Sequence, residues 1–261
     1  MRSEHATAAL RPFAVDYHHQ GFALLPGLLA PALVQRLQAA TQRIQHDQAT
    51  LPAALRDHLV FERDLSVKGR SGVEATAVGD AIFIIGDPPA FDPVFGELLQ
   101  HAGLCAAARA LLGTQGLVFH FMNVTIKHAG FGRAIGWHRD YPNSYMSTPG
   151  ADFLRLMLPL DGMDADMGAT GFVGGTHGVS DDEARRLKAD KVRADEPAPE
   201  RLQWAHCAAG DLVAIHPKVL HGGGMNRSGR ARRNVVLQVG RADAPVIGEG
   251  RESITGLPVL G

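Results

Sequence analysis

Residues 117–127 read Leu-Val-Phe-His-Phe-Met-Asn-Val-Thr-Ile-Lys, and from this stretch onward the residue pattern becomes that of short β-strands. Successive side chains of a β-strand point to opposite faces, so every second residue shares a face. Alternation here places on one face Phe119, Phe121, Asn123, Thr125 and Lys127. The stretch therefore predicts a β-strand with one face that becomes polar toward its end.

More short strands are expected on the C-terminal side of this stretch. Residues 153–160, 211–215 and 234–239 are apolar runs separated by loops that contain Gly, Pro and Asp. Short strands punctuated in this way favour an antiparallel sandwich or barrel over alternating βαβ units.

The first third of the chain is expected to be mostly helical. Residues 31–45 have the pattern of an amphipathic helix, and Pro31 suits its first turn. The expected apolar face consists of Leu33, Val34, Leu37, Ala40, Thr41 and Ile44. A second helix is predicted over 93–112, closed by Gly113, with a short strand at 81–85 before it. We find no internal repeat or linker, so residues 1–261 are interpreted as a single, mainly β domain with flanking helices.

The composition argues against several classes of main partner, although a local basic patch is compatible with it. The 261 residues carry 26 Lys and Arg against 27 Asp and Glu, a net charge of -1, whereas nucleic acid or an anionic membrane needs a basic face. Cys105 and Cys207 form no disulfide or zinc pattern. The start has no apolar signal region, and the longest apolar run, 81–85, is too short to span a bilayer. We expect a cytoplasmic protein.

A histidine and a carboxylate stand two residues apart in Gly136-Trp137-His138-Arg139-Asp140. On a strand they would share a face and could converge on one metal ion. A second histidine, His221, comes 81 residues after Asp140, where a strand is expected to lead into a turn of three glycines at 222–224. Two imidazoles and a carboxylate on one side of an octahedral iron(II) leave room for a chelating 2-oxo acid and for O2.

The last predicted strand offers an anion-binding side chain. Alternation places Arg232 on the polar face, together with Asn234 and Gln238, and its planar fork suits a carboxylate. The neighbouring arginines are expected to face solvent, namely Arg227, Arg230 and Arg233.

Together these motifs resemble the phytanoyl-CoA dioxygenase family of iron(II)/2-oxoglutarate oxygenases. The family pattern is His-x-Asp, a distal His with a Gly/Ser turn and Asn-x-Ser, then Arg eleven residues beyond that His. The positions that match it are His138, Asp140, His221, Asn226, Ser228 and Arg232. Residues 17–27 resemble the usual N-terminal entry of the family, and residues 168–177 resemble its Asn-Gly-x-Thr and Pro-Gly-Ser-His segments.

The resemblance implies a double-stranded β-helix (jelly-roll, cupin-like) core, with iron(II), 2-oxoglutarate and O2 as cofactor and co-substrates. It also implies that Lys127 contacts 2-oxoglutarate, although an exposed strand lysine is almost equally compatible with the sequence. The chain departs from the family at Met167 for Asn, Gly174 for Pro, and Gly223 for a Ser that often touches 2-oxoglutarate. The last departure leaves open how the far carboxylate is held beside Arg232; Thr170 is a candidate to assist, or simply a turn residue.

The expected activity is oxidation, with hydroxylation as the favoured outcome, of a small-molecule metabolite or natural-product intermediate, with release of succinate and CO2. A halogenase of this kind needs a small residue at the position of Asp140, so halogenation is not expected. Desaturation and ring formation are the alternatives to hydroxylation. One alternative is a zinc or manganese hydrolase or isomerase on a cupin-like barrel. Another is a binding protein without turnover. The triplet His138-Arg139-Asp140 does not indicate a kinase, because Tyr145 stands where that motif needs Asn.

Two features near the expected site remain open. His177 and His216 could support the metal ligands, although hydrogen-bonded structural histidines are favoured. Residues 181–201 are densely charged and favour a solvated helix and loop, with a mobile lid over the site as the alternative. The sequence indicates no oligomeric state.

Overall fold

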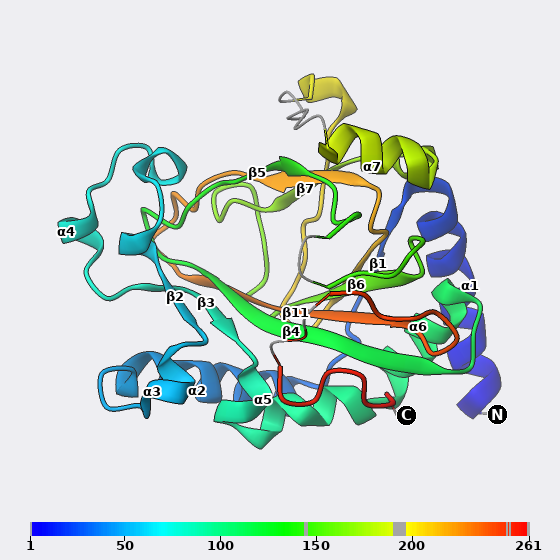
Figure 1. Ribbon diagram of the computed structural model, residues 1–261, viewed down its shortest axis with the longest axis horizontal. Coiled ribbons are helices and arrows are strands. Elements are labelled where there is room, and N and C mark those ends of the chain that lie inside the picture. Colours follow the sequence, from blue (N-terminus) through cyan, green and yellow to red (C-terminus); the bar gives the residue numbers. More distant parts are fainter. Residues whose placement is uncertain (1, 144–145, 190–196, 249, 251, 260–261) are drawn as a thin grey trace.

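Two antiparallel β-sheets form the centre of the computed structural model, which describes residues 2–143, 146–189, 197–248, 250 and 252–259 (Figure 1). The larger sheet contains, in spatial order, β1 (Phe22–Leu25), β9 (Leu212–Ile215), β6 (Phe153–Pro159), β11 (Arg232–Arg241), β4 (Leu117–Lys127), β3 (Ile82–Gly86) and β2 (Leu59–Phe61). The smaller sheet contains β5 (Ile135–His138), β10 (Leu220–Gly223), β7 (Thr170–Val173) and β8 (Gln203–Trp204). Two facing antiparallel sheets with flanking helices confirm the predicted jelly-roll class.

Helices flank the larger sheet, and α2, α3 and α5 lie on its side away from the smaller sheet (Figure 1). The helices are α1 (Arg2–Gln20), α2 (Pro31–Asp47), α3 (Ala53–Arg56), α4 (Ala75–Val78), α5 (Pro88–Phe91), α6 (Ala102–Leu112) and α7 (Asp181–Ala189). Short 3-10 segments are η1 (Glu62–Asp64), η2 (Val67–Arg70), η3 (Pro93–Gln100), η4 (Thr176–Gly178) and η5 (Pro199–Arg201). Among these described helices, none combines the length and apolar character needed to cross a bilayer.

Strand alternation divides the larger sheet into an apolar face and a polar face. Val235 and Leu237 of β11 belong to the main core that the helices cover, together with the predicted buried face of α2. Arg232, Asn234 and Val236 point the other way, into a cavity between the sheets. The predicted parity of this strand is therefore confirmed, and it determines which side chains can reach a ligand.

The alternation predicted for β4 is wrong at one residue, Phe119. Phe121 pairs with Gln238, but Val239 pairs with Phe119, so His120 is an extra residue at a bulge. The bulge turns Phe119 into the main core, whereas Phe121 stays on the polar face, beneath the Arg155 guanidinium. A bulge leaves no mark in a simple alternating pattern, which explains the error.

Two helical features also differ from the expectation or were missed. The predicted helix over 93–112 is two segments, because the extended backbone of His101 separates η3 from α6. His101 then caps α6, accepting a hydrogen bond from the backbone N–H of Leu104. Helix α1 was not predicted; its Phe13 and Tyr17 side chains are buried in the main core.

The extra residue His120 is fully buried and joins a polar network. The Nε of Arg155 donates to Gln238 Oε1, which fixes the amide orientation, so Gln238 Nε2 donates to His120 Nδ1. The Nε2 of His120 therefore carries the ring proton. Burial lowers the pKa of His120 to about 4, so the folded protein holds this ring neutral.

We expect His120 to make the metal-free protein less stable in acid. Its folded pKa, about 4, lies below the ordinary value of 6.5, so the unfolded chain takes up the proton first as pH falls. The free energy of unfolding should drop by about 3 kcal/mol between pH 7 and pH 4 from this residue. Denaturant unfolding at each pH should show a shallower pH dependence in His120→Asn, whose amide oxygen can replace Nδ1 as acceptor. An unchanged slope, equal to that of the control His206→Asn at an exposed site, would contradict the assignment.

Candidate metal centre

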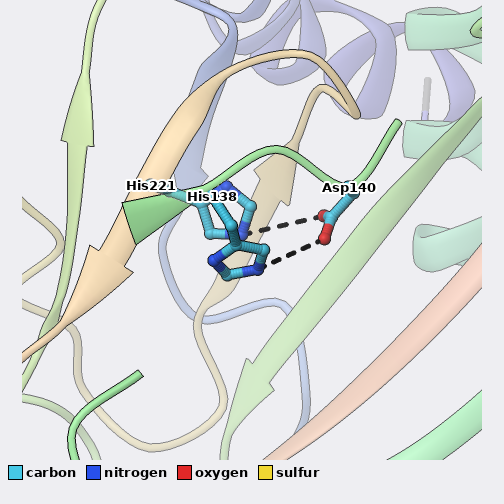
Figure 2. Close-up of side chains that lie close together, drawn as sticks. All are labelled: His138, Asp140 and His221. Carbon is cyan, nitrogen blue, oxygen red and sulfur yellow. Dashed lines mark ion pairs between the residues drawn. The ribbon is translucent and has the colours of Figure 1, made fainter. Parts of the chain in front are cut away.

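The two predicted histidine ligands lie opposite each other on paired strands. His221 of β10 is the register partner of His138 of β5, and their ring centroids are 4.3 Å apart. Asp140 follows just beyond the end of β5, and its carboxylate oxygens lie 3.5 Å from His138 Nε2 and 3.7 Å from His221 Nε2 (Figure 2). One potential ligand atom from each residue falls within 4.8 Å of the others. The structure thus brings together the three side chains that the sequence predicted.

The local setting of His221 differs from the prediction. His221 does not end the strand at 212–215; it lies on the separate strand β10, and Gly222 and Gly223 continue that strand instead of forming a turn. A Cβ at Gly222 would lie 3.1 Å from Trp137 Cδ2 and from the carbonyl oxygen of Ile135. Glycine is needed here because β5 and its Trp137 pack directly on the backbone of β10.

Backbone carbonyls orient both imidazoles. His138 Nδ1 lies 2.8 Å from the carbonyl oxygen of Gly136, and His221 Nδ1 lies 3.0 Å from that of Val219. A carbonyl can only accept, so each Nδ1 donates, and each Nε2 faces Asp140, where it can bind a metal. Burial, reinforced by the nearby His138, lowers the pKa of His221 to about 4 and keeps it neutral.

Arg155 holds the third ligand. Its Nη1 lies 2.6 Å from Asp140 Oδ1, whereas Oδ2 is buried with no hydrogen-bond partner among the described residues. Burial alone would raise the pKa of Asp140, but Arg155, His221 and His138 outweigh it and hold that pKa below its usual value. Two imidazoles whose Nε2 atoms face an ionised carboxylate with a free oxygen fit iron(II). The sequence analysis did not identify Arg155, which has the same parity on β6 as Met157, and both line the cavity.

The metal centre lines a cavity of about 360 Å³ between the sheets. At one end of this cavity, Lys127 of β4 and Arg232 of β11 are cross-strand partners, and both are buried. The exposed-lysine interpretation of Lys127 is therefore wrong. Thr170 of β7 also lines the cavity, with its hydroxyl 3.8 Å from the sulfur of Met157.

One backbone carbonyl serves both cations. Gly168 O accepts from Lys127 Nζ at 3.1 Å and from Arg232 Nη1 at 2.7 Å, and Lys127 also donates to Gly224 O. Arg232 Nε is buried without a partner, and among described residues no carboxylate forms an ion pair with either cation. Burial, and then Arg232, lower the pKa of Lys127, and burial lowers the pKa of Arg232 to about 10. Two adjacent buried cations are stable only if an anion compensates them.

Gly223, which stands where the family often has Ser, fits the position of Lys127. A Cβ at Gly223 would lie 3.2 Å from Lys127 Nζ and 3.2 Å from the carbonyl oxygen of Ala169. The missing side chain therefore leaves space for the ammonium group of Lys127.

The other arginines and histidines near the site lie in different settings. Arg227 and Arg230 are exposed as expected, but Arg233 is not solvent-facing: its side chain is 11% exposed and pairs with Asp161. His177 and His216 do not line the cavity; their rings lie 5.0 Å apart, and His216 Nδ1 accepts from the backbone of Lys218. Of residues 181–201, the first part forms α7, and 190–196 lie outside the described residues.

A family model for phytanoyl-CoA dioxygenase (PhyH) matches residues 17–234. The chain belongs to the phytanoyl-CoA dioxygenase family. This PhyH membership identifies a non-haem iron- and 2-oxoglutarate-dependent dioxygenase, which agrees with the donor set of the metal centre.

Two curated proteins resemble this PhyH chain. It is 26% identical over 257 residues to L-proline trans-4-hydroxylase of Streptomyces griseoviridis, covering 89% of this chain and 86% of that protein. It is 30% identical over 159 residues to dioxygenase aneA of Aspergillus aculeatus, covering 58% of this chain. The match spans only 50% of the length of aneA.

Solved structures share the PhyH fold. EctD from S. alaskensis with bound Fe superimposes with a TM-score of 0.71 at 21% identity, covering 92% of this chain and 79% of that one. The epimerase SnoN in complex with Fe3+, alpha ketoglutarate and nogalamycin RO gives a TM-score of 0.69 at 19% identity, covering 98% and 97%. These likenesses support the jelly-roll architecture.

Gly168 should be the most sensitive glycine near the site. Its φ is +66°, and an added Cβ would lie 2.4 Å from the carbonyl oxygen of Gly224. Gly168→Ala should lower the free energy of unfolding by about 1–3 kcal/mol, because both the backbone and the carbonyl that anchors the cations must move. The control Gly224→Ala, where a Cβ meets nothing within 4 Å, should stay within about 0.5 kcal/mol. Equal losses in denaturant unfolding would contradict this account.

Proposed function

We propose that this protein hydroxylates a small-molecule metabolite, with its metal held by His138, Asp140 and His221 and 2-oxoglutarate held at its far carboxylate by Arg232 and Lys127. One observation supports this most directly. The cavity that contains the three convergent ligands also contains two buried cations without an acidic ion-pair partner among the described residues. A dianionic 2-oxo acid fits such a site, because one carboxylate can reach the metal and the other can neutralise the cations.

Each ligand has a defined task in this proposal. The Nε2 atoms of His138 and His221 and the Oδ2 atom of Asp140 bind the metal, while Gly136 O, Val219 O and Arg155 hold the other side of each group. When bound, iron(II) with 2-oxoglutarate supplies the oxidising chemistry that the side chains lack. The protein fixes the geometry and keeps the carboxylate ionised.

The cations would bind the far carboxylate in different ways. Arg232 presents a planar fork with its Nε free, whereas Lys127 adds a point charge already positioned by Gly168 O and Gly224 O. Gly223 leaves the space that Lys127 occupies. Thr170, on the wall of the same cavity, is placed to assist with its hydroxyl.

The size of the cavity limits the substrate. About 360 Å³ lies at the low end of ligand pockets, and the co-substrate must share it. This favours a small metabolite, as in the related L-proline trans-4-hydroxylase, over a long lipid thioester. Asp140 fills the third protein ligand position, which supports hydroxylation instead of halogenation.

Succinate formation from 2-oxoglutarate tests the proposal. Anaerobically reconstituted protein should form succinate only with both iron(II) and O2, and Asp140→Ala should abolish it. Turnover with zinc and without O2 would instead favour the hydrolase or isomerase alternative.

Arg232→Gln should raise the KM for 2-oxoglutarate about 10- to 100-fold, the size of one lost charge-assisted hydrogen bond. The control Arg227→Gln, at an exposed position, should change it less than about twofold. Equal KM values in Arg232→Gln and wild type would contradict the assigned role of Arg232.

A further inference from the structure

The charge lining the cavity is strongly unbalanced. The described lining includes one carboxylate, that of Asp140, and five basic side chains. The basic residues are Lys127, Arg139, Arg155, Lys188 and Arg232. The protein as a whole is nearly neutral, with a net charge of -1, so this excess belongs to the cavity and not to the general composition.

The proposed function accounts for three of these cations. Arg155 pairs with Asp140 at 2.6 Å, and Lys127 and Arg232 are assigned to the far carboxylate of 2-oxoglutarate. Arg139 and Lys188 remain. They come from different elements, the segment after β5 and helix α7, yet line the same cavity.

Arg139 is poorly satisfied by the protein alone. Its Nη2 donates to the carbonyl oxygen of Thr176 at 3.3 Å, but its Nε is buried without a hydrogen-bond partner among the described residues. A half-buried guanidinium with a free donor is suited to an anion from outside the chain.

Lys188 differs from the other basic residues of α7. Arg185 pairs with Asp182 at 2.7 Å, and Arg186 pairs with Glu183 at 2.7 Å, each three residues earlier on the helix. Lys188 is exposed and has no ion-pair partner among the described residues, and it reaches the cavity that these two arginines do not line. It therefore adds a second positive charge on the more exposed side of the cavity.

We propose that Arg139 and Lys188 bind an anionic group, a carboxylate or a phosphate, of the small-molecule substrate. This inference rests on the proposed function, because it assigns Lys127 and Arg232 to the co-substrate. The anion is held at the exposed side of the cavity while the rest of the substrate extends toward the metal. Asn123, Thr125 and Asn234 also line the cavity and offer polar groups for hydrogen bonds to the substrate. Substrate orientation then follows from electrostatic complementarity at both ends of the cavity.

Small probes test this without knowledge of the substrate. Protein loaded with cobalt(II) and saturating 2-oxoglutarate is titrated with acetate, inorganic phosphate or acetamide, and paramagnetic relaxation of the probe resonances reports binding near the metal. At least one anion should bind about tenfold more tightly than neutral acetamide. Preference for acetate indicates a carboxylate substrate, and preference for phosphate indicates a phosphate ester.

Variants assign the anion site to the two residues. Arg139→Gln and Lys188→Met should each weaken anion binding about tenfold or more, whereas Arg186→Met on the same helix should leave it within about twofold. Unchanged anion affinity in both Arg139→Gln and Lys188→Met, or equal binding of acetate and acetamide to wild type, would overturn the proposal. Unaltered thermal unfolding of each variant shows that lost binding is not lost folding.

The same preparations separate this inference from the function beneath it. Iron- and O2-dependent succinate formation without added substrate tests the oxygenase assignment alone. If succinate forms but the affinity for the anion does not depend on Arg139 and Lys188, only the proposed anion site is refuted. If anion binding depends on them but no succinate forms, the oxygenase assignment fails while the anion site stands.

Discussion

The buried carboxylate of Asp140 is the group on which the site depends. A buried charge is stable only when it is paired and hydrogen-bonded. Asp140 meets this condition through Arg155 of β6, from the larger sheet, and through His138 and His221 of the smaller sheet. Its partners therefore couple the two sheets at the metal centre. Arg155 occupies one oxygen and leaves the other directed at the place where the imidazole lone pairs converge.

Positive charge organises the rest of the cavity. Lys127 and Arg232 are buried side by side on neighbouring strands, and a single backbone carbonyl, that of Gly168, accepts from both. These two cations have no acidic ion-pair partner among the described residues, so they lower the stability of the fold without ligand. Ligand sites commonly lower folding stability in this way. The constraint reaches the backbone, since a Cβ at Gly168 would lie 2.4 Å from a carbonyl oxygen and one at Gly223 would lie 3.2 Å from Lys127 Nζ.

Much of this arrangement could be predicted from the sequence, because it rests on short-range periodicity and spacing. Strand parity placed Arg232 in the cavity. His138 and Asp140 converge as predicted, but Asp140 lies beyond the end of β5 and not on the shared strand that the prediction assumed. Features that depend on long-range packing could not be predicted: the bulge at His120, the partnership of Arg155 with Asp140, and the ion pair that buries Arg233. The burial of Lys127 could not be predicted, because strand alternation indicates which face of the sheet a side chain lies on but not whether that position is buried.

The central claim is that the three ligands and the two buried cations form one site for iron(II) and 2-oxoglutarate. Anaerobic titration with both, followed by the visible absorption that arises when a 2-oxo acid chelates iron(II), tests it most directly. We expect one iron per chain, an absorption band only when both are present, and its loss in His221→Ala. Equally tight binding of 2-oxoglutarate without metal, or an unchanged band in His221→Ala, would contradict the account.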